Sequence, residues 1–193
     1  MAMKLLEDRI SKDGKVIGGE VLKVDSFINH QMDPALFKEM ALEWKRLFNG
    51  SEINKILTIE ASGIGIAAVA GLEFGCPVVF AKKSKSSNTP EDAYSAVVKS
   101  FTRGTVNDIY VSKKYLNAGD KILILDDFMA MGEAARGLVK LVEQAGAELV
   151  GIGIAIEKSF QPGGAGLRSM GIRVESLARV KEMTEENGIV FES

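Results

Sequence analysis

The chain has 193 residues, 46% hydrophobic and 26% charged, with a net charge of −2, so we expect one globular domain with a large core. That charge gives no general attraction to nucleic acid or to an anionic membrane, and no apolar run approaches the roughly 20 residues that span a bilayer. The single cysteine and single histidine exclude an internal disulfide and leave little material for a Cys/His metal site; with a charged N-terminus unlike a signal peptide, they favour the cytoplasm.

The N-terminal quarter is expected to hold two helices separated by irregular extended structure. Apolar residues at helical spacing predict a short helix over Met3 to Ser11, and the β-branched run from Val16 to Ile28 predicts extended structure. Asp33 and Pro34 suit the N-cap and first position of a second helix, which should run to about Phe48. This helix should bury Leu36, Met40, Trp44 and Leu47.

Two buried strands follow, and each ends in small or polar residues. Ile56 to Ile59 predicts the first strand, with Glu60, Ala61, Ser62 and Gly63 after it. An Ala- and Gly-rich helix is then expected from about Ile64 to Phe74. Val78 to Ala81 predicts the second strand, which is followed by the basic cluster Lys82, Lys83 and Lys85.

The middle of the chain is expected to contain a mobile loop and a hairpin. The run from Ser84 to Pro90 is polar and rich in turn-forming residues. Tyr94 to Phe101 and Asp108 to Ser112 are expected to be two arms of a hairpin around Arg103, Gly104 and Thr105. A mobile segment from about 84 to 112 could then close over a bound substrate.

The stretch from Lys121 to Gly137 combines a strand, two acids, a small-residue turn and a helix. Ile122 to Leu125 is apolar and too short for most helices, so it predicts a central strand of a parallel sheet. Asp126 and Asp127 follow directly. A turn through Ala130, Met131 and Gly132 then leads into a helix that begins near Glu133.

The C-terminal part is expected to add two strands, a loop and a tail. Leu149 to Ile156 predicts a buried strand that ends in Glu157 and Lys158. Gln161 to Gly166 is expected to be a glycine-rich loop, Arg173 to Leu177 a last strand, and Lys181 to Ser193 a polar tail.

Strands that alternate with helices predict an α/β fold with a mainly parallel sheet, and ligands bind such sheets at the carboxyl ends of the strands. All four polar clusters named above fall at such ends. Carboxylates can accept hydrogen bonds from ribose hydroxyls, and a turn that opens a helix can bind phosphate through backbone N–H groups. An ordinary crossover whose acids merely cap the sheet edge is the alternative.

The sequence ILILDDFMAMGEA resembles the phosphoribosyl pyrophosphate motif of type I phosphoribosyltransferases, departing from it at Phe128 and Met131. Further segments resemble the bacterial xanthine phosphoribosyltransferase family. They are VLKVDSFINHQMDP, VVFAKKSKS, IGIAIEKSFQPGG and RVESLARV, so the resemblance covers most of the chain.

The resemblance implies the type I phosphoribosyltransferase fold, a central mainly parallel sheet flanked by helices. A core of about residues 36–157 would carry a small hood from about residues 1–35 and 158–193. It also implies transfer of phosphoribose from 5-phosphoribosyl 1-pyrophosphate to N9 of xanthine, with Mg²⁺ bound mainly through the diphosphate. A homodimer is implied, and neither a nucleic acid nor a membrane partner.

The resemblance also implies residue roles. Xanthine would be held by Leu22, Asn29 and Lys158. Asp126 and Asp127 would be the catalytic, ribose-binding acids. The 5′-phosphate would bind at Ala130, Met131, Gly132, Glu133 and Ala134, and the pyrophosphate at Ala61, Ser62, Gly63 and Lys83. No protein side chain would serve as a dedicated metal ligand.

Three points follow from the chemistry of these residues. An ammonium at Lys158 stabilises negative charge on a 6-oxo purine and has nothing to accept from a 6-amino base. The carboxylate of Glu133 is unfavourable beside a phosphate unless it points away. Two alternatives stay open: a transferase for guanine, hypoxanthine or adenine, and a non-catalytic purine regulator with this fold.

Overall fold

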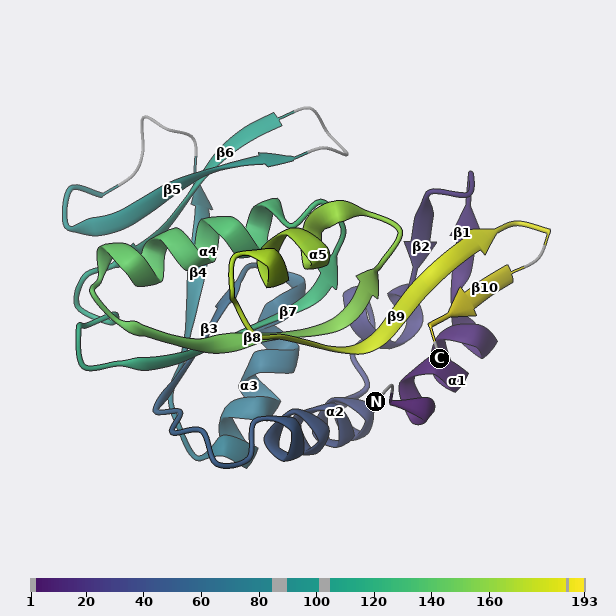
Figure 1. Cartoon of the computed structure of the whole chain (residues 1–193), viewed down its shortest axis with the longest axis horizontal. Helices are drawn as coiled ribbons and strands as arrows, with labels where there is room; N and C mark the ends of the chain where they lie inside the picture. The colour runs from purple at the N-terminus through teal and green to yellow at the C-terminus, as the bar shows by residue number, and fades with distance from the viewer. Residues whose placement is uncertain (1–2, 85–89, 101–104, 187, 193) are drawn as a thin grey trace.

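The computed structural model describes residues 3–84, 90–100, 105–186 and 188–192. Its main sheet has eight strands in the order β10-β9-β8-β7-β3-β4-β6-β5, and a separate ribbon pairs β1 with β2 (Figure 1). The strands are β1 (Lys15–Ile17), β2 (Val21–Lys23), β3 (Lys55–Ile59), β4 (Val78–Ser84), β5 (Ala93–Ser100), β6 (Thr105–Ser112), β7 (Lys121–Met129), β8 (Glu148–Lys158), β9 (Val174–Thr184) and β10 (Gly188–Phe191). The helices are α1 (Lys4–Asp13), the short π-helical turn η1 (Asp25–Asn29), α2 (Pro34–Leu47), α3 (Ser62–Phe74), α4 (Glu133–Gln144) and α5 (Pro162–Ser169).

The centre of the main sheet is parallel, as predicted. Strands β9, β8, β7, β3 and β4 pair in parallel, whereas β10, β6 and β5 are antiparallel additions at the two edges. The central run Ile122 to Leu125 is fully buried, as expected for a strand covered on both faces. Because the central strands are parallel, their carboxyl ends lie at one edge of the sheet, where the polar clusters were expected.

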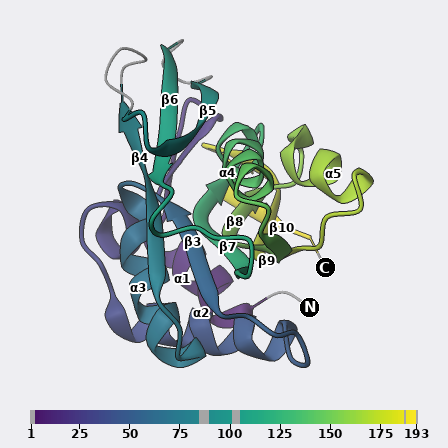
Figure 2. The same cartoon turned by 90° about the vertical axis from the view of Figure 1, so that its left-hand side faces the viewer.

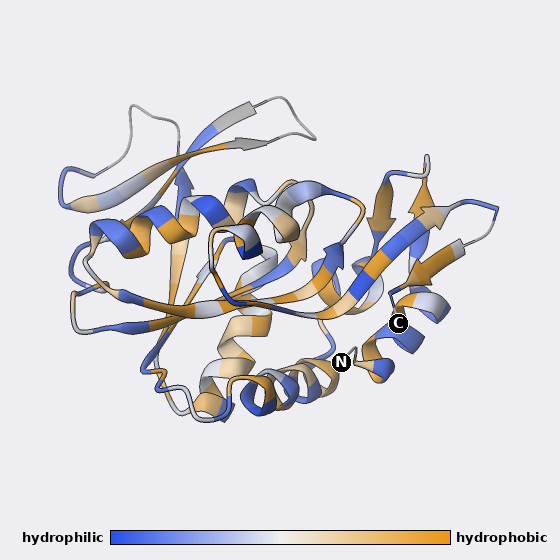
Figure 3. Cartoon of the chain, viewed as in Figure 1, coloured by the Kyte–Doolittle hydropathy of each residue, from blue (hydrophilic) through white to orange (hydrophobic). Residues whose placement is uncertain are grey.

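Helices cover both faces of the sheet. Figure 2 shows α1, α2 and α3 on one side and α4 and α5 on the other. Successive residues of β3 divide between two apolar cores, since Ile56 packs with the α2–α3 side and Leu57 with the α4 side. Helix α3 has few hydrophilic residues along its length (Figure 3), and its small residues let it approach the sheet closely. A Cβ added at Gly71 would lie 2.6 Å from a methyl carbon of Val78.

Helix α2 begins where the sequence predicts. The Asp33 carboxylate accepts a hydrogen bond from the backbone N–H of Leu36 at 3.2 Å and another from Arg9 at 2.8 Å. The cap therefore ties α2 to α1 as well as satisfying a free N–H of its first turn. Of the four side chains expected to be buried, Leu36, Met40 and Trp44 are buried, whereas Leu47 is only partly buried.

The first and last segments of the chain lie together at one end of the molecule (Figure 1). The backbone N–H of Met3 donates to the carbonyl of Leu177 at 2.7 Å, and that of Gly18 donates to the Glu185 carboxylate at 2.7 Å. We call these segments, residues 3–35 and 158–192, the hood segments. Strand β9 of the second segment pairs with β8 from Ile152 to Lys158, and β9 contacts both α1 and β1 of the first segment.

Two expectations for the C-terminal part are wrong. Residues 161–166 are not a loop, because Pro162 starts helix α5, whose glycines let it pack closely: a Cβ at Gly163 would lie 2.4 Å from the Ala130 carbonyl oxygen. The described residues of the predicted polar tail, 181–186 and 188–192, are not a tail, because β9 continues to Thr184 and pairs with β10. Its inward residues include Val180 and Met183, which are buried between polar neighbours.

The predicted hairpin is confirmed, with β5 and β6 antiparallel in a register that opposes Tyr94 to Val111. Within the predicted mobile segment, residues 85–89 and 101–104 lie outside the described residues.

Candidate active site

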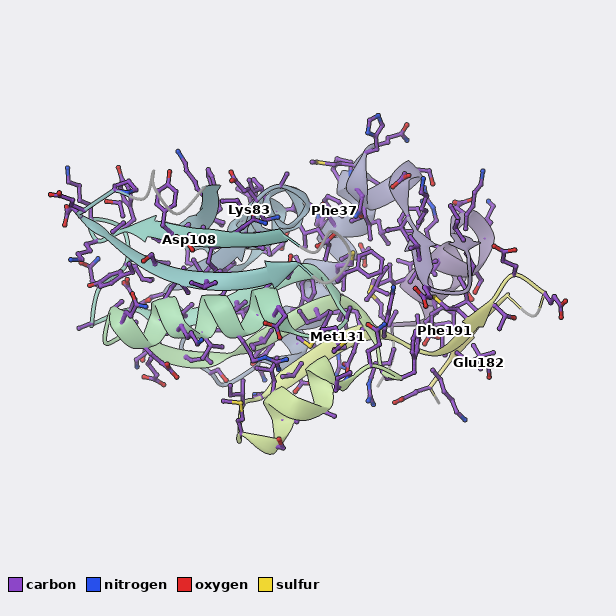
Figure 4. All side chains as sticks on the ribbon, turned by 90° about the horizontal axis from the view of Figure 1, so that it is seen from above. Phe37, Lys83, Asp108, Met131, Glu182 and Phe191 are labelled. Atoms are coloured by element: carbon purple, nitrogen blue, oxygen red, sulfur yellow. The ribbon has the colours of Figure 1, made fainter. Side chains whose placement is uncertain are left out.

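A cavity of about 680 Å³ opens at the carboxyl ends of β3, β4 and β7. Its wall includes every residue predicted to bind phosphoribosyl pyrophosphate: Ala61, Ser62, Gly63, Lys83, Asp126, Asp127, Ala130, Met131, Gly132, Glu133 and Ala134. Figure 4 shows Lys83 beside the β5–β6 hairpin and Met131 next to the start of α5. Segments far apart in the sequence therefore meet here as predicted.

The two acids lie within β7, which extends past them to Met129. Asp126 is 5% exposed, and one of its carboxylate oxygens accepts the backbone N–H of Asp127 at 3.0 Å. Burial, and after it the charge of Asp127, raises the pKa of Asp126 well above its usual value, while Lys83 opposes the shift. Asp126 therefore retains a proton more readily than a free aspartate would. It can both donate to and accept from vicinal hydroxyls.

Two turns on the cavity wall have the small residues and free helix start that phosphate binding needs, and we call them phosphate-type turns. The first, Ala130 to Gly132, joins β7 to α4. Gly132 is its N-cap and has φ of +79°, a left-handed conformation that favours glycine. No side chain caps α4, so the first N–H groups of the helix have no side-chain partner at its start. Residues 131–135 line the cavity, which makes this end of α4 a suitable place for an anion.

The second turn joins β3 to α3. Helix α3 also begins without a side-chain cap, at Ala61, after a cis peptide bond between Glu60 and Ala61. A Cβ at Gly63 would lie 2.2 Å from Thr58 Oγ1 and 3.0 Å from Asp126 Oδ1, so only glycine lets α3 come this close to the acids. The Glu60 carboxylate accepts the backbone N–H of Lys83 at 2.5 Å, which fixes β4 beside this turn.

The three residues predicted to hold xanthine do not line this cavity. Asn29, at the end of η1, reaches it indirectly by donating its side-chain N–H to Asp127 Oδ2 at 3.1 Å. Lys158, at the end of β8, donates from Nζ to the backbone carbonyl of Glu20 at 2.6 Å. Leu22 is buried in β2, two residues beyond Glu20. Of the three, only Asn29 is therefore bonded to a residue of the cavity wall, whereas the Lys158–Glu20 bond joins the two hood segments to each other.

Glu157 and Lys158, the last two residues of β8, differ in their partners and in the direction in which burial shifts their pKa values. Burial lowers the pKa of Lys158, and the Glu20 carboxylate opposes that shift. Glu157 is 1% exposed and accepts two 2.7 Å hydrogen bonds from Arg168 and one from Ser176. Burial alone raises the pKa of Glu157, but these donors outweigh it and the pKa lies below its usual value. Glu157, expected with the site cluster, instead joins β8, β9 and α5.

Sequence reasoning missed three residues that shape the site. Arg136 donates to the Met131 carbonyl, and its spacing of three from Glu133 was a usable signal. Gly163 packs on the Ala130–Gly132 turn, and its N–H donates to the Ala130 carbonyl at 3.1 Å. Glu20 acts through its carbonyl oxygen, for which a sequence carries no signal.

Two phosphate-type turns, an acid pair between them and a lysine-bearing strand end give the cavity a chemistry that would suit a phosphorylated ribose. The phosphoribosyl transferase domain family matches residues 30–164. The chain therefore belongs to the phosphoribosyltransferase family.

Curated relatives of the chain indicate a narrower family within this one. The xanthine phosphoribosyltransferase of Ruminiclostridium cellulolyticum is 59% identical over 186 residues, which cover 96% of this chain and 97% of that protein. Xanthine phosphoribosyltransferase 2 of Clostridium botulinum is 55% identical over 190 residues, or 98% and 100% of the two chains. The resemblance to the xanthine phosphoribosyltransferase family is confirmed.

Solved structures confirm the fold class. The adenine phosphoribosyltransferase of Thermoanaerobacter pseudethanolicus superposes with a TM-score of 0.71 at 20% identity, covering 90% of this chain and 99% of that one. That of Rhodothermus marinus gives 0.73 at 21% identity, with 92% and 99% covered. At this identity the likeness concerns the type I phosphoribosyltransferase fold alone. Among the described helices, none is long and apolar enough to span a bilayer.

Proposed function

We propose that this protein transfers phosphoribose from 5-phosphoribosyl 1-pyrophosphate to N9 of xanthine, giving xanthosine 5′-monophosphate and pyrophosphate in purine salvage. The observation that carries the proposal is the hydrogen bond from Asn29 to Asp127, which joins the predicted base-binding segment to the predicted donor site. The names of the relatives at 55–59% identity support the choice of xanthine.

The donor would occupy the 680 Å³ cavity. Its 5′-phosphate would take the N–H groups at Ala130 to Ala134, and its pyrophosphate those at Ala61 to Gly63, with Lys83 adding positive charge. Asp126 and Asp127 would hold the ribose hydroxyls. Such a site accelerates the reaction by positioning the ribose carbon and stabilising charge, without a covalent intermediate on the protein.

Mg²⁺ is compatible with this donor set. The described residues contain no group of three or more His, Cys, Asp or Glu side chains that could hold a metal ion. Mg²⁺ keeps several waters and binds substrate phosphates through few protein ligands, so a cavity that offers the carboxylates of Asp126 and Asp127 suits it. When bound, it would neutralise charge on the pyrophosphate leaving group.

In the reaction, the bond from C1′ to pyrophosphate breaks, the bond from C1′ to N9 forms, and the N9 proton leaves to solvent. The ribose carbon gains positive charge as pyrophosphate departs, and the acid pair beside the ribose favours that charge. On the acceptor, the Lys158 ammonium would stabilise the negative charge of deprotonated xanthine at its 6-oxo group. A 6-amino base offers Lys158 only donors, which disfavours adenine.

Turnover with purified protein, phosphoribosyl pyrophosphate, Mg²⁺ and each purine base separately tests the proposal. We expect xanthosine monophosphate to form fastest. Faster nucleotide formation from adenine, guanine or hypoxanthine would reassign the base, and no nucleotide from any base would favour a non-catalytic regulator.

We further propose a cytoplasmic homodimer. The lone Cys76, which is a free thiol, suits a reducing compartment. Light scattering on the purified protein would test the dimer, and a monomeric mass at micromolar concentration would contradict it.

A further inference from the structure

The phosphate-type turn before α4 carries an acidic residue that should weaken phosphate binding. Glu133 is the first residue of α4 and lines the cavity. Its side chain is 32% exposed, so water screens its charge only in part. An unpaired carboxylate at this position would repel a phosphate bound to the same helix end.

Arg136 lies one turn further along α4 and faces this carboxylate. Its Nη2 lies 3.2 Å from Glu133 Oε1, and the same nitrogen donates to the Met131 carbonyl at 2.5 Å. The Arg136 side chain is 34% exposed. One guanidinium therefore contacts both the turn and the acidic residue that follows it.

Packing against α5 restricts where this guanidinium can lie. A Cβ added at Gly132 would be 3.3 Å from Arg136 Nη1, and one added at Gly166 would be 3.6 Å from it. The guanidinium thus sits between the turn and α5, with a glycine on each side. A fixed guanidinium loses less side-chain entropy on ion pairing than a free surface arginine does.

We propose that Arg136 is a positioning residue for the donor phosphate, because it neutralises Glu133 and holds that carboxylate in place beside the Ala130–Gly132 turn. The proposal rests on the proposed function only in naming phosphoribosyl pyrophosphate as the donor. It predicts that Arg136 is needed because Glu133 is present, and that removing both charges restores binding.

The test uses three variants, Arg136→Gln, Glu133→Gln and the double variant, with ribose 5-phosphate binding measured by calorimetry and KM measured for both substrates. Arg136→Gln should weaken ribose 5-phosphate binding and raise KM for phosphoribosyl pyrophosphate by about tenfold at low salt, and by less in 1 M NaCl. KM for xanthine should change less than about twofold. The double variant should lie within about threefold of the wild type.

Arg46→Gln is the matched control. Arg46 pairs with Glu43 in α2 at the same spacing of three residues and at 2.7 Å. Its replacement should leave the affinity for ribose 5-phosphate and both KM values unchanged. An unchanged Arg136→Gln, or an equal loss in the double variant, would overturn the proposal and make Arg136 a structural residue. If Arg136→Gln does not fold, the double variant compared with Glu133→Gln decides, since a loss greater than threefold also overturns it. Ribose 5-phosphate binding needs no base, so a protein inactive on xanthine that still shows this pattern contradicts only the proposed function.

Discussion

Replacing Lys158 by alanine should impair binding of the purine and leave binding of the donor intact. The Lys158 ammonium is half-buried and donates one hydrogen bond, to the Glu20 carbonyl at 2.6 Å. An ammonium has three donors, so two stay available for the 6-oxo side of xanthine. Lys158→Ala removes the charge from the acceptor side of the site without altering either phosphate-type turn.

A hydrogen bond to a charged group contributes about 1.5–3 kcal/mol, which corresponds to an increase of about 10- to 150-fold in KM for xanthine. The lower half of that range is expected, because Lys158 is partly exposed and water replaces part of the lost interaction. Loss of the bond to Glu20 should also loosen the β1–β2 ribbon, with a small decrease in melting temperature.

Initial-rate kinetics with each substrate varied in turn measure both KM values. Lys45→Ala is the matched control, because Lys45 likewise donates to a distant backbone carbonyl, that of Glu73 in the neighbouring helix. Its KM values should not change. Equal increases in both KM values for Lys158→Ala, or an unchanged KM for xanthine, would refute a base-binding role for Lys158.

Three further predictions concern the acids, the lysine and α5. Asp126→Asn should lower kcat/KM by about 100-fold but raise the melting temperature at pH 8 by roughly 2–4 °C. The reason is that a carboxyl with a raised folded-state pKa stabilises the fold below its usual value of 3.8 and loses that contribution as pH rises through the raised value; a lower melting temperature at pH 8 would contradict it. The pKa of Lys158 is lowered, so the ammonium loses its proton, and KM for xanthine rises, at a pH below the usual value of 10.5. Lys158→Ala should lack this rise, and a rise that persists in the variant would implicate another group. Gly163→Ala should raise KM for phosphoribosyl pyrophosphate by about tenfold, since its Cβ would lie 2.6 Å from the Gly132 nitrogen. Gly119→Ala is the control, because its Cβ meets open space and should have no effect. The same KM for phosphoribosyl pyrophosphate in both variants would contradict the prediction.

The central elements could be predicted because their signals are local. The buried run before Asp126, the small residues after Ile59 and the cap at Asp33 each specify their own structure within a few residues. The C-terminal elements could not, because their signals depend on partners. Glycine is a poor helix former, so residues 162–166 give no local signal for a helix. The glycines of α5 instead allow close packing on the Ala130–Gly132 turn, which the sequence alone does not reveal.

The residues of the site also fall into a part that local sequence signals predict and a part that they do not. The residues on the cavity wall follow strand ends, so a parallel sheet brings them together once its strands are recognised. Asn29 comes from an irregular segment that a pattern of strands does not locate, and only the family resemblance indicated it. Lys158 follows a predicted strand, but its role in binding the base came from the resemblance alone. Their contacts, with the Asp127 side chain and the Glu20 carbonyl, depend on tertiary packing.

The order of synthesis sets when the N-terminal helix α1 can pack. Helix α1 leaves the ribosome well before β9 and β10, yet it packs against both of them. Leu6 and Ile10 are fully buried in the core that also contains Leu177, Val180 and Met183, so this part of the core is complete only when those residues have been made. Contacts this distant in sequence close late and are open to chaperones in the meantime. In a nascent chain, α1 should therefore reach its final packing only after β9 and β10 have been made.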